Sequence, residues 1–163
     1  LKNQIGFKLF KSDFEKNILE VSAPYVFIDK GIFKMIFTEK TFDPIKNEYI
    51  EKIKLASSFD GIDWDLSNNP ILSPKFNWEG NGVANWGIIK IDDIYFMSYS
   101  SNVANRANKN TSLGIAFSKD LKVWTRLKEK PFLTNQRCCS SFFRFEFNLK
   151  AEKSLHDSAY MKL

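Results

Sequence analysis

The sequence predicts an all-β fold built from repeated four-stranded units, as in the blades of a β-propeller. Three observations lead to this prediction. Aromatic residues make up 15% of the 163 residues, and the 16 Phe among them favour strands over helices. The pattern Ala-x-Ser-x-Asp-x-x-x-Trp occurs twice, in KLASSFDGIDW (Lys54–Trp64) and in LGIAFSKDLKVW (Leu113–Trp124). The segments on both sides of this pattern also repeat, which indicates a repeated structural unit.

The spacing of the repeat is nearly constant along the chain. Upstream of the pattern, YVFIDKGIFKMIFT resembles GIIKIDDIYFMSYS, and downstream of it NPIL resembles KPFL. Four-stranded units of this length are typical of propeller blades. Matched residues are 62, 60 and 61 positions apart, as in the pairs Met35 and Met97, Trp64 and Trp124, and Pro70 and Pro131.

Each unit is expected to hold four short strands in the same order. The units cover about residues 21–83 and 84–137, and an atypical tail follows at 138–163. Apolar and aromatic runs separated by polar turns mark the strands. The first strand is expected to begin near Ala23 or Ala84, the second to end near Thr38 or Ser100, and the third to cover 51–57 or 112–118.

The repeated pattern itself is expected to be architectural. Its Asp, at position 60 or 120, lies in the turn before the fourth strand, where a carboxylate accepts hydrogen bonds from nearby backbone N–H groups. Its Trp, expected on the fourth strand, supplies a large apolar side chain for packing between sheets. Outside the two units, residues 5–14 form a weak partial copy, residues 140–150 alternate like a strand, and residues 151–163 fit a short helix or a tail.

Composition and charge exclude several classes of function. The net charge is +5, but the lysines are scattered and form no basic stripe, which argues against a nucleic-acid partner. No apolar run approaches the roughly 20 residues of a membrane-spanning helix. His156 is the single histidine, and Cys138 and Cys139 are adjacent, so no zinc-site spacing exists and neither a metal nor an organic cofactor is expected. The chain begins with Leu, so the sequence decides neither a cytoplasmic nor a secreted location.

With these residues in view, the chain resembles the five-bladed β-propeller glycosidases. This group includes arabinanase- and xylosidase-like enzymes, invertase-like fructosidases and mannoside phosphorylases. The resemblance covers about residues 21–133 and rests on four phrases: APYVFIDKGIFKMIFT, IKLASSFDGIDW, WEGNGVANWGIIKIDDIYFMSYS and LGIAFSKDLKVWTR with KPFL. It implies a five-bladed propeller of which about two to three blades are present. It also implies a carbohydrate partner, either an oligosaccharide or a glycoside.

The chain departs from the family pattern where the resemblance implies catalytic carboxylates. Such enzymes usually carry an acidic residue beside the Pro that opens an inner strand. Here that place holds Ser22-Ala23-Pro24, and its counterpart in the second unit holds Ala84-Asn85-Trp86. Neither place offers a carboxylate, so the catalytic candidates must come from other positions.

The candidates come mainly from loops that a propeller groups on one face, expected at residues 39–50, 67–83 and 101–111. Glycoside hydrolysis uses two carboxylates. The proposed acid is Glu79, because the apolar neighbour Trp78 is expected to raise its pKa, although a solvated loop Glu is the plainer interpretation. Glu20, before the first inner strand, is the second catalytic candidate. The expected substrate-binding residues are Trp78, Trp86, Asn85, Asp43 and Arg106.

The leading hypothesis is a glycoside hydrolase-like enzyme that uses carboxylate acid and base chemistry. Two alternatives stay open: a non-catalytic sugar-binding propeller or inactive fragment, and a glycoside phosphorylase. Two to three units cannot close a five-bladed ring. We therefore expect residues 1–163 to be part of a longer propeller, with self-association through open blade edges when the chain is alone.

Overall fold

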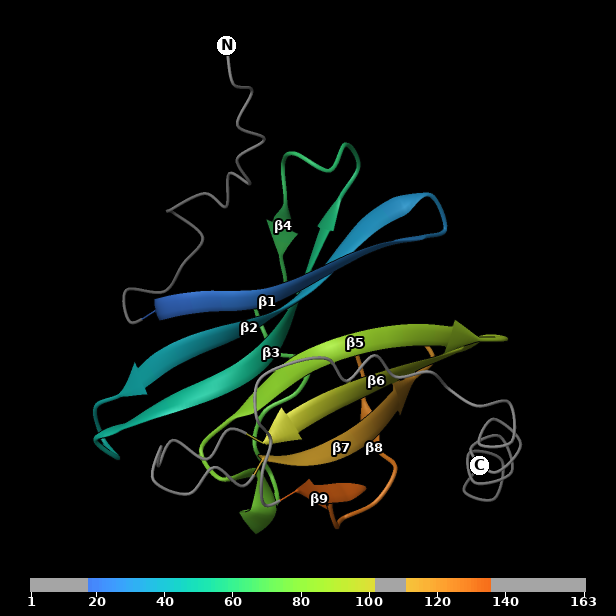
Figure 1. Ribbon diagram of the computed structural model, residues 1–163. Coiled ribbons are helices and arrows are strands. Elements are labelled where there is room, and N and C mark those ends of the chain that lie inside the picture. The colour runs from blue at the N-terminus through green and yellow to red at the C-terminus, as the bar shows by residue number, and fades with distance from the viewer. Residues whose placement is uncertain (1–17, 102–110, 136–163) are drawn as a thin grey trace.

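The computed structural model describes residues 18–101 and 111–135, which form two antiparallel sheets of strands paired largely in chain order (Figure 1). The first sheet, blade 1, consists of β1 (Ile18–Asp29), β2 (Ile32–Asp43), β3 (Glu48–Ser58) and β4 (Asp65–Leu66). The second sheet, blade 2, consists of β5 (Val83–Ile91), β6 (Ile94–Ser101), β7 (Thr111–Ser118), β8 (Thr125–Arg126) and β9 (Leu133–Asn135), and β9 pairs with β7. The prediction of an all-β fold made of propeller-type blades is confirmed, and blade 2 adds β9 as a fifth strand to the four that were predicted.

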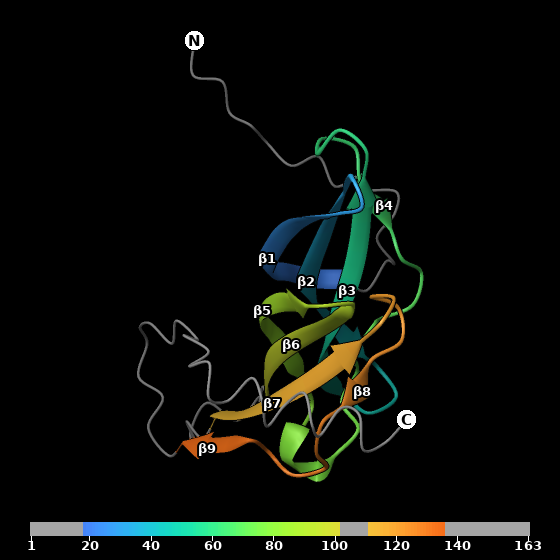
Figure 2. The same cartoon turned by 90° about the vertical axis from the view of Figure 1, so that its right-hand side faces the viewer.

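The two blades stack face to face, as the side view shows (Figure 2). β5, the first strand of blade 2, contacts β1, β2 and β3 of blade 1. The core between the blades contains Ile36, Ile53 and Leu55 of blade 1 together with Met97 and Trp124 of blade 2. Because these apolar side chains leave water only when two blades meet, the interface between neighbours stabilises both of them.

Alternation along the strands gives each blade two different faces. The Trp face of blade 2 carries Met97, Tyr99, Ala116 and Trp124, and it packs against the opposite face of blade 1. In blade 1 the residues matched by the repeat form a separate buried cluster, which contains Met35, Phe37, Ala56 and Trp64. The repeat therefore preserves which face each apolar side chain occupies.

The Ser-x-Asp part of the repeated pattern closes the same turn in both blades. In blade 1 the Ser58 hydroxyl accepts the N–H groups of Asp60 and Gly61, and Asp60 Oδ1 accepts those of Ile62 and Asp63. In blade 2, Ser118 and Asp120 make the matching bonds over residues 120–123. These hydrogen bonds hold the pKa of both aspartates below its ordinary value. The expected architectural role of this Asp is confirmed.

The NPIL and KPFL segments return to the third strand of their own blade. The Ile71 N–H donates to the Ile53 carbonyl at 2.8 Å, and the Phe132 N–H donates to the Leu113 carbonyl at 2.7 Å. The match between NPIL and KPFL therefore marks a backbone contact with the third strand of each blade. The four strands predicted for each unit do not include this contact. Leu72 makes this contact as a single bridge, whereas Leu133 begins the short strand β9.

Two expectations about strand boundaries are wrong. Residues 39–50 do not form a long loop, because β2 and β3 continue as a hairpin and leave a turn of only residues 44–47. Paired side chains across the strands extend the hairpin: Lys54 Nζ lies 3.4 Å from Glu39 Oε2, and the Phe42 and Tyr49 rings are 5.3 Å apart. Each repeated Trp comes directly before β4 or β8 and does not lie on the strand.

Several predicted segments lie outside the described residues. These are the partial copy at 5–14, the loop tip at 102–110, the alternating segment at 140–150 and the tail at 151–163. Within residues 18–101 and 111–135, no helix has the length and apolar character needed to cross a membrane.

Candidate functional site

Both inner strands contain a β-bulge close to their start. In β1 the pairing with β2 shifts between Ser22 and Tyr25, and Ala23 has a φ of 51°, in the left-handed region. In β5 the pairing with β6 shifts between Asn85 and Gly87. Bulges commonly lie next to active sites, where they redirect side chains, and left-handed non-glycine residues also cluster there.

The two bulges occupy the same place in the repeat. Ser22 pairs with Thr38 in blade 1, and Ala84 pairs with Ser100 in blade 2. Each residue of the second pair lies 62 positions after its counterpart in the first pair (84 − 22 and 100 − 38). The bulge is therefore a feature of the repeated structural unit. The two bulges also coincide with the place where the family resemblance implies a catalytic carboxylate. This makes the bulged starts of β1 and β5 the candidate functional site, although neither bulge contains an acidic residue.

The linker between the blades brings Glu79 next to this site in the chain. Glu79 lies in the 3-10 helix η1 (Asn77–Glu79), four residues before β5 begins, and it is fully buried. Its Oε2 accepts the backbone N–H groups of Lys75 at 2.6 Å and Phe76 at 3.0 Å. A Glu at the third position of a helix commonly satisfies the N-terminal N–H groups in this way.

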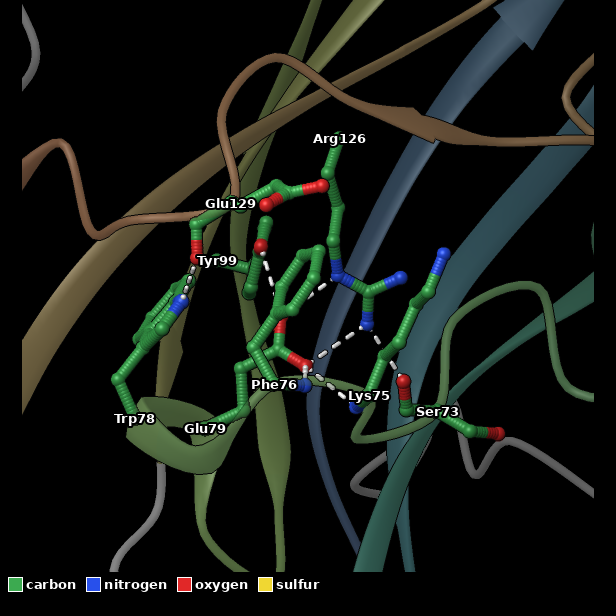
Figure 3. A network of polar contacts seen from close by, with 8 residues as sticks. All are labelled: Ser73, Lys75, Phe76, Trp78, Glu79, Tyr99, Arg126 and Glu129. Atoms are coloured by element: carbon green, nitrogen blue, oxygen red, sulfur yellow. Dashed lines mark hydrogen bonds and ion pairs between the residues drawn. The ribbon is translucent and has the colours of Figure 1, made fainter.

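Arg126 of β8 completes the surroundings of Glu79 (Figure 3). Its Nε donates to Glu79 Oε1 at 2.6 Å, and its Nη2 donates to Glu79 Oε2 at 2.9 Å and to the Ser73 carbonyl at 2.6 Å. The Tyr99 hydroxyl donates to Glu79 Oε1 at 2.9 Å. We call Glu79, Arg126, Tyr99 and Ser73 the Glu79 network. A bidentate guanidinium–carboxylate pair is the strongest common type of ion pair in proteins.

The expected rise in the pKa of Glu79 is not what the structure gives. Desolvation by burial raises this pKa, but the hydrogen bonds from Arg126, from the Lys75 and Phe76 N–H groups and from Tyr99 together outweigh it. The pKa therefore lies below its ordinary value, whereas a general acid needs a raised one. Sequence reasoning considered the neighbouring Trp78 and missed the cationic partner, which comes from a strand 47 residues away.

The Tyr99 side chain reaches Glu79 because its ring passes over Gly114, which has no side chain in the way. Tyr99 on β6 pairs with Gly114 on β7, and a Cβ on Gly114 would lie 2.5 Å from the Tyr99 hydroxyl oxygen. The absence of a side chain lets the ring lie flat over the neighbouring strand. Burial is the main reason that the pKa of Tyr99 is raised, with the Glu79 charge adding to it, so the hydroxyl stays protonated as a donor.

Trp78 is half-buried and belongs to the same region. Its ring stacks on Tyr99 with centroids 5.8 Å apart, and its indole N–H donates to the Glu129 carbonyl at 2.7 Å. Both interactions hold the linker against blade 2. Stacking of Trp78 on a sugar ring stays a prediction.

The other predicted site residues are spread over the structure. Glu20 lies on β1 with 58% of its side chain exposed, and Lys40 Nζ lies 3.9 Å from its Oε2. Asp43 ends β2, and its Oδ1 accepts the N–H groups of Ile45 and Lys46 in the 44–47 turn. Asn85 and Trp86 lie at the β5 bulge, but their side chains are outside the described part, as is all of Arg106.

The two catalytic candidates are not brought together by any direct contact. Among the described residues, no hydrogen bond or ion pair joins Glu20 to Glu79. The described ranges also contain no group of three His, Cys, Asp or Glu side chains arranged to hold a metal ion. The arrangement around Glu79 is that of an anchored carboxylate, which fixes the linker that leads into β5.

Comparison with known proteins places the chain among carbohydrate-active propellers. Residues 26–155 match the family model of glycoside hydrolase family 130, described as beta-1,4-mannooligosaccharide phosphorylase. A 1,2-beta-oligomannan phosphorylase from Thermoanaerobacter sp. (strain X514) is 31% identical over 100 residues, which cover 60% of this chain and 33% of that protein. The chain thus spans about a third of the length of this curated relative.

Solved structures share the fold. A β-fructofuranosidase of glycoside hydrolase family 32 from Bombyx mori is 21% identical with a TM-score of 0.56, over 65% of this chain and 22% of that chain. A β-1,2-mannobiose phosphorylase from Listeria innocua, in complex with β-1,2-mannobiose, is 13% identical with a TM-score of 0.53, over 69% of this chain and 45% of that chain. The expected resemblance to five-bladed propeller glycosidases is therefore confirmed, and the described blades share the fold of part of such propellers.

Proposed function

Since the chain belongs to glycoside hydrolase family 130, we propose that it takes part in the phosphorolysis of β-linked mannooligosaccharides. The observation that carries this proposal is the family match over residues 26–155, supported by the identity of 31% to an oligomannan phosphorylase. Because the chain spans about a third of that relative, the proposal concerns the activity of a whole propeller to which these blades contribute.

The chemistry of phosphorolysis suits the residues at the inner-strand bulges. In hydrolysis one carboxylic acid protonates the leaving oxygen, and a second carboxylate activates water or attacks the sugar. In phosphorolysis an anionic phosphate oxygen attacks the anomeric carbon, the glycosidic C–O bond breaks, and the acid's proton goes to the leaving oxygen, which becomes a hydroxyl. Phosphate already carries the negative charge, so one carboxylate fewer is needed. Inner strands without a carboxylate at Ala23 or Asn85 are compatible with this requirement.

The proposed ligand at the bulges is an oligosaccharide. Asn85 supplies an amide for sugar hydroxyls, and Trp86 supplies an aromatic ring for stacking. Arg106 stays a prediction for a further polar contact. The structural neighbour from family 32 supports the fold alone at 21% identity, so hydrolysis, the leading hypothesis from the sequence, stays a prediction.

The test compares products with and without inorganic phosphate. The complete propeller that contains these blades is incubated with β-1,4-mannobiose or β-1,2-mannobiose, and phosphorus NMR and sugar chromatography follow the products. Phosphate-dependent formation of mannose 1-phosphate is expected. Free mannose formed equally well without phosphate would support hydrolysis instead. Saturable binding without either product would support the non-catalytic alternative, and each of these two results would overturn the proposal.

A further inference from the structure

A groove lined by both polar and apolar side chains lies between the blades at the end opposite the 44–47 turn. It has a volume of about 700 Å³, and both blades line it. Blade 1 and the following linker contribute Lys34, Ser57, Asn68 and Asn69, and the β7–β8 turn of blade 2 contributes residues 120–122. We call this the interblade groove. Its volume falls within the range of roughly 300–1,000 Å³ that is typical of small-ligand sites.

The groove lies beside the candidate functional site and does not include it. Lys34 pairs with Phe27 and Ser57, whereas the β1 bulge lies opposite residues 36–38 of β2. The four residues of strand from Lys34 to Thr38 span roughly 13 Å. None of residues 22–25 or 84–87 lines the groove. A ligand in the groove would therefore contact other residues than a ligand at the bulges.

The lining combines apolar side chains with hydrogen-bonding groups. Leu55, Ile71 and Leu121 line the groove and are all less than 10% exposed. Lys34 Nζ donates to the Ser57 hydroxyl at 2.9 Å and keeps two further N–H donors. A pyranose ring has the same division, since its C–H faces are apolar and its hydroxyl edges donate and accept hydrogen bonds.

Several polar groups of the groove have unused hydrogen-bonding capacity. Among the described residues, the side-chain amides of Asn68 and Asn69 make no hydrogen bond, and Lys34 forms no ion pair. Asp120 uses Oδ1 in its turn, which leaves Oδ2 as an acceptor within the same ranges. Donors and acceptors therefore occur on both sides of the groove, as recognition of vicinal hydroxyls requires.

The charges of the groove balance, which favours a neutral ligand. Asp29 also lines it, but Lys90 Nζ lies 3.6 Å from Asp29 Oδ1 and neutralises this carboxylate. The lining charges that remain are Asp65 and Asp120 against Lys34 and Lys122. A phosphate-like anion would meet two carboxylates, whereas an uncharged sugar would meet donors and acceptors without net repulsion.

We propose that the interblade groove is a second carbohydrate-binding site, which takes a neutral oligosaccharide. Lys34 and the Asn68–Asn69 amides hydrogen-bond its hydroxyls, while Leu55, Ile71 and Leu121 contact its apolar ring faces. The choice of a mannooligosaccharide as the ligand rests on the proposed function. The groove itself is formed by residues of both blades and the linker, whichever oligosaccharide fills it.

The test is a titration of the isotope-labelled chain with β-1,4-mannotriose, followed by NMR. Saturable shifts of the Asn68 and Asn69 side-chain amides are expected. Lys34→Met keeps the length of the side chain and removes its donors, so it should weaken binding by at least about tenfold, as for one or two lost hydrogen bonds. The Asn68→Ala/Asn69→Ala double variant, followed through the Ser57 and Lys122 backbone amides, should weaken binding to a similar degree.

Lys52→Met is the matched control. Lys52 is half-buried on β3, but it points to the opposite sheet face from Ser57 because their positions differ by an odd number. Its binding curve should match that of the wild type. No saturable shift in the wild type, or equal weakening by Lys34→Met and Lys52→Met, would overturn the proposal.

The same titration of the complete propeller that contains these blades, repeated with inorganic phosphate, separates this proposal from the proposed function. Groove binding without mannose 1-phosphate formation there would leave the groove proposal standing and overturn phosphorolysis. Mannose 1-phosphate formation with unshifted groove amides would do the reverse.

Discussion

Glu79 and Arg126 lie 47 residues apart in the chain and form a bidentate ion pair with N–O distances of 2.6 and 2.9 Å. The Glu79 side chain is fully buried, and the Arg126 side chain is 11% exposed. The pair joins the linker that precedes β5 to β8, which lies at the other end of the strand order β5-β6-β7-β8. It therefore holds the entry of the inner strand against the outer edge of the same blade.

Replacing Glu79 by Gln should destabilise the fold. The amide keeps the shape but removes the charge, so Arg126 is left buried without its counter-ion. Breaking a buried ion pair from one side typically costs about 3–5 kcal/mol. Chemical denaturation of the wild type and of Glu79→Gln, compared at pH 7, measures this loss.

Glu129→Gln is the control for this change. The Glu129 side chain is exposed, and it is the backbone carbonyl that accepts the bond from Trp78. Its unfolding free energy should stay close to that of the wild type. A Glu79→Gln variant that keeps wild-type stability but loses turnover would contradict the anchoring role and favour the catalytic role predicted from the sequence.

The same carboxylate should make stability depend on pH in the acid range. Its folded-state pKa lies below the ordinary value of 4.5, so the folded state binds this proton less readily than the unfolded state does. The stabilisation is complete above about pH 4.5 and is lost as the pH falls through the folded-state pKa. Melting temperatures between pH 7 and pH 3 should fall more steeply for the wild type than for Glu79→Gln. Parallel curves would show that Glu79 does not titrate in this window.

Much of the fold could be predicted from the repeat, because short-range patterns encode it. Period-two alternation and the Ser-x-Asp turns are local, and they give the strands, their order and the buried faces. The hairpin through residues 39–50 could not be predicted in the same way. Its strands extend because of cross-strand pairs such as Glu39 with Lys54, and such pairs depend on a register that the sequence does not state.

The Glu79 network was missed because its members come from three separate segments. One signal could have found it, namely the positions where the two repeats differ. Tyr99, Gly114 and Arg126 occupy the places that Phe37, Lys54 and Leu66 occupy in the first unit. All three changes add a group that contacts Glu79 or make room for one. The bulges, in contrast, required the pairing register and had no signal in the residue types.

Gly114→Ala should disturb the network without touching a charge. The new Cβ would overlap the Tyr99 ring, which lies across Gly114 and donates to Glu79. Overpacking of this kind typically costs about 1–3 kcal/mol. In a Tyr99→Leu background the ring is absent, so adding Gly114→Ala should cost far less, and a double-mutant cycle by denaturation measures this coupling.

Gly87→Ala is the matched glycine control on β5. A Cβ there meets no atom within 4 Å, so its cost should be small. Equal costs at Gly87 and Gly114, or additive effects of Gly114→Ala and Tyr99→Leu, would show that the close approach of Tyr99 does not explain the glycine.

The two copies of the Ser-x-Asp turn should contribute equally to stability. Ser58 and Ser118 are 3% and 2% exposed, and each hydroxyl accepts two backbone N–H groups and donates to the Asp two residues later. Replacing either by Ala leaves the same donors unsatisfied. Each change should therefore cost about 1 kcal/mol, by analogy with the loss of a helix N-cap.

Because the turns lie in different blades and share no partner, the double variant should lose the sum of the two costs. Thermal and chemical denaturation of Ser58→Ala, Ser118→Ala and the double variant measure this. A large loss of unfolding free energy at one position and none at the other would contradict this prediction. It would mean that the same turn, with the same hydrogen bonds, stabilises the two blades to different degrees.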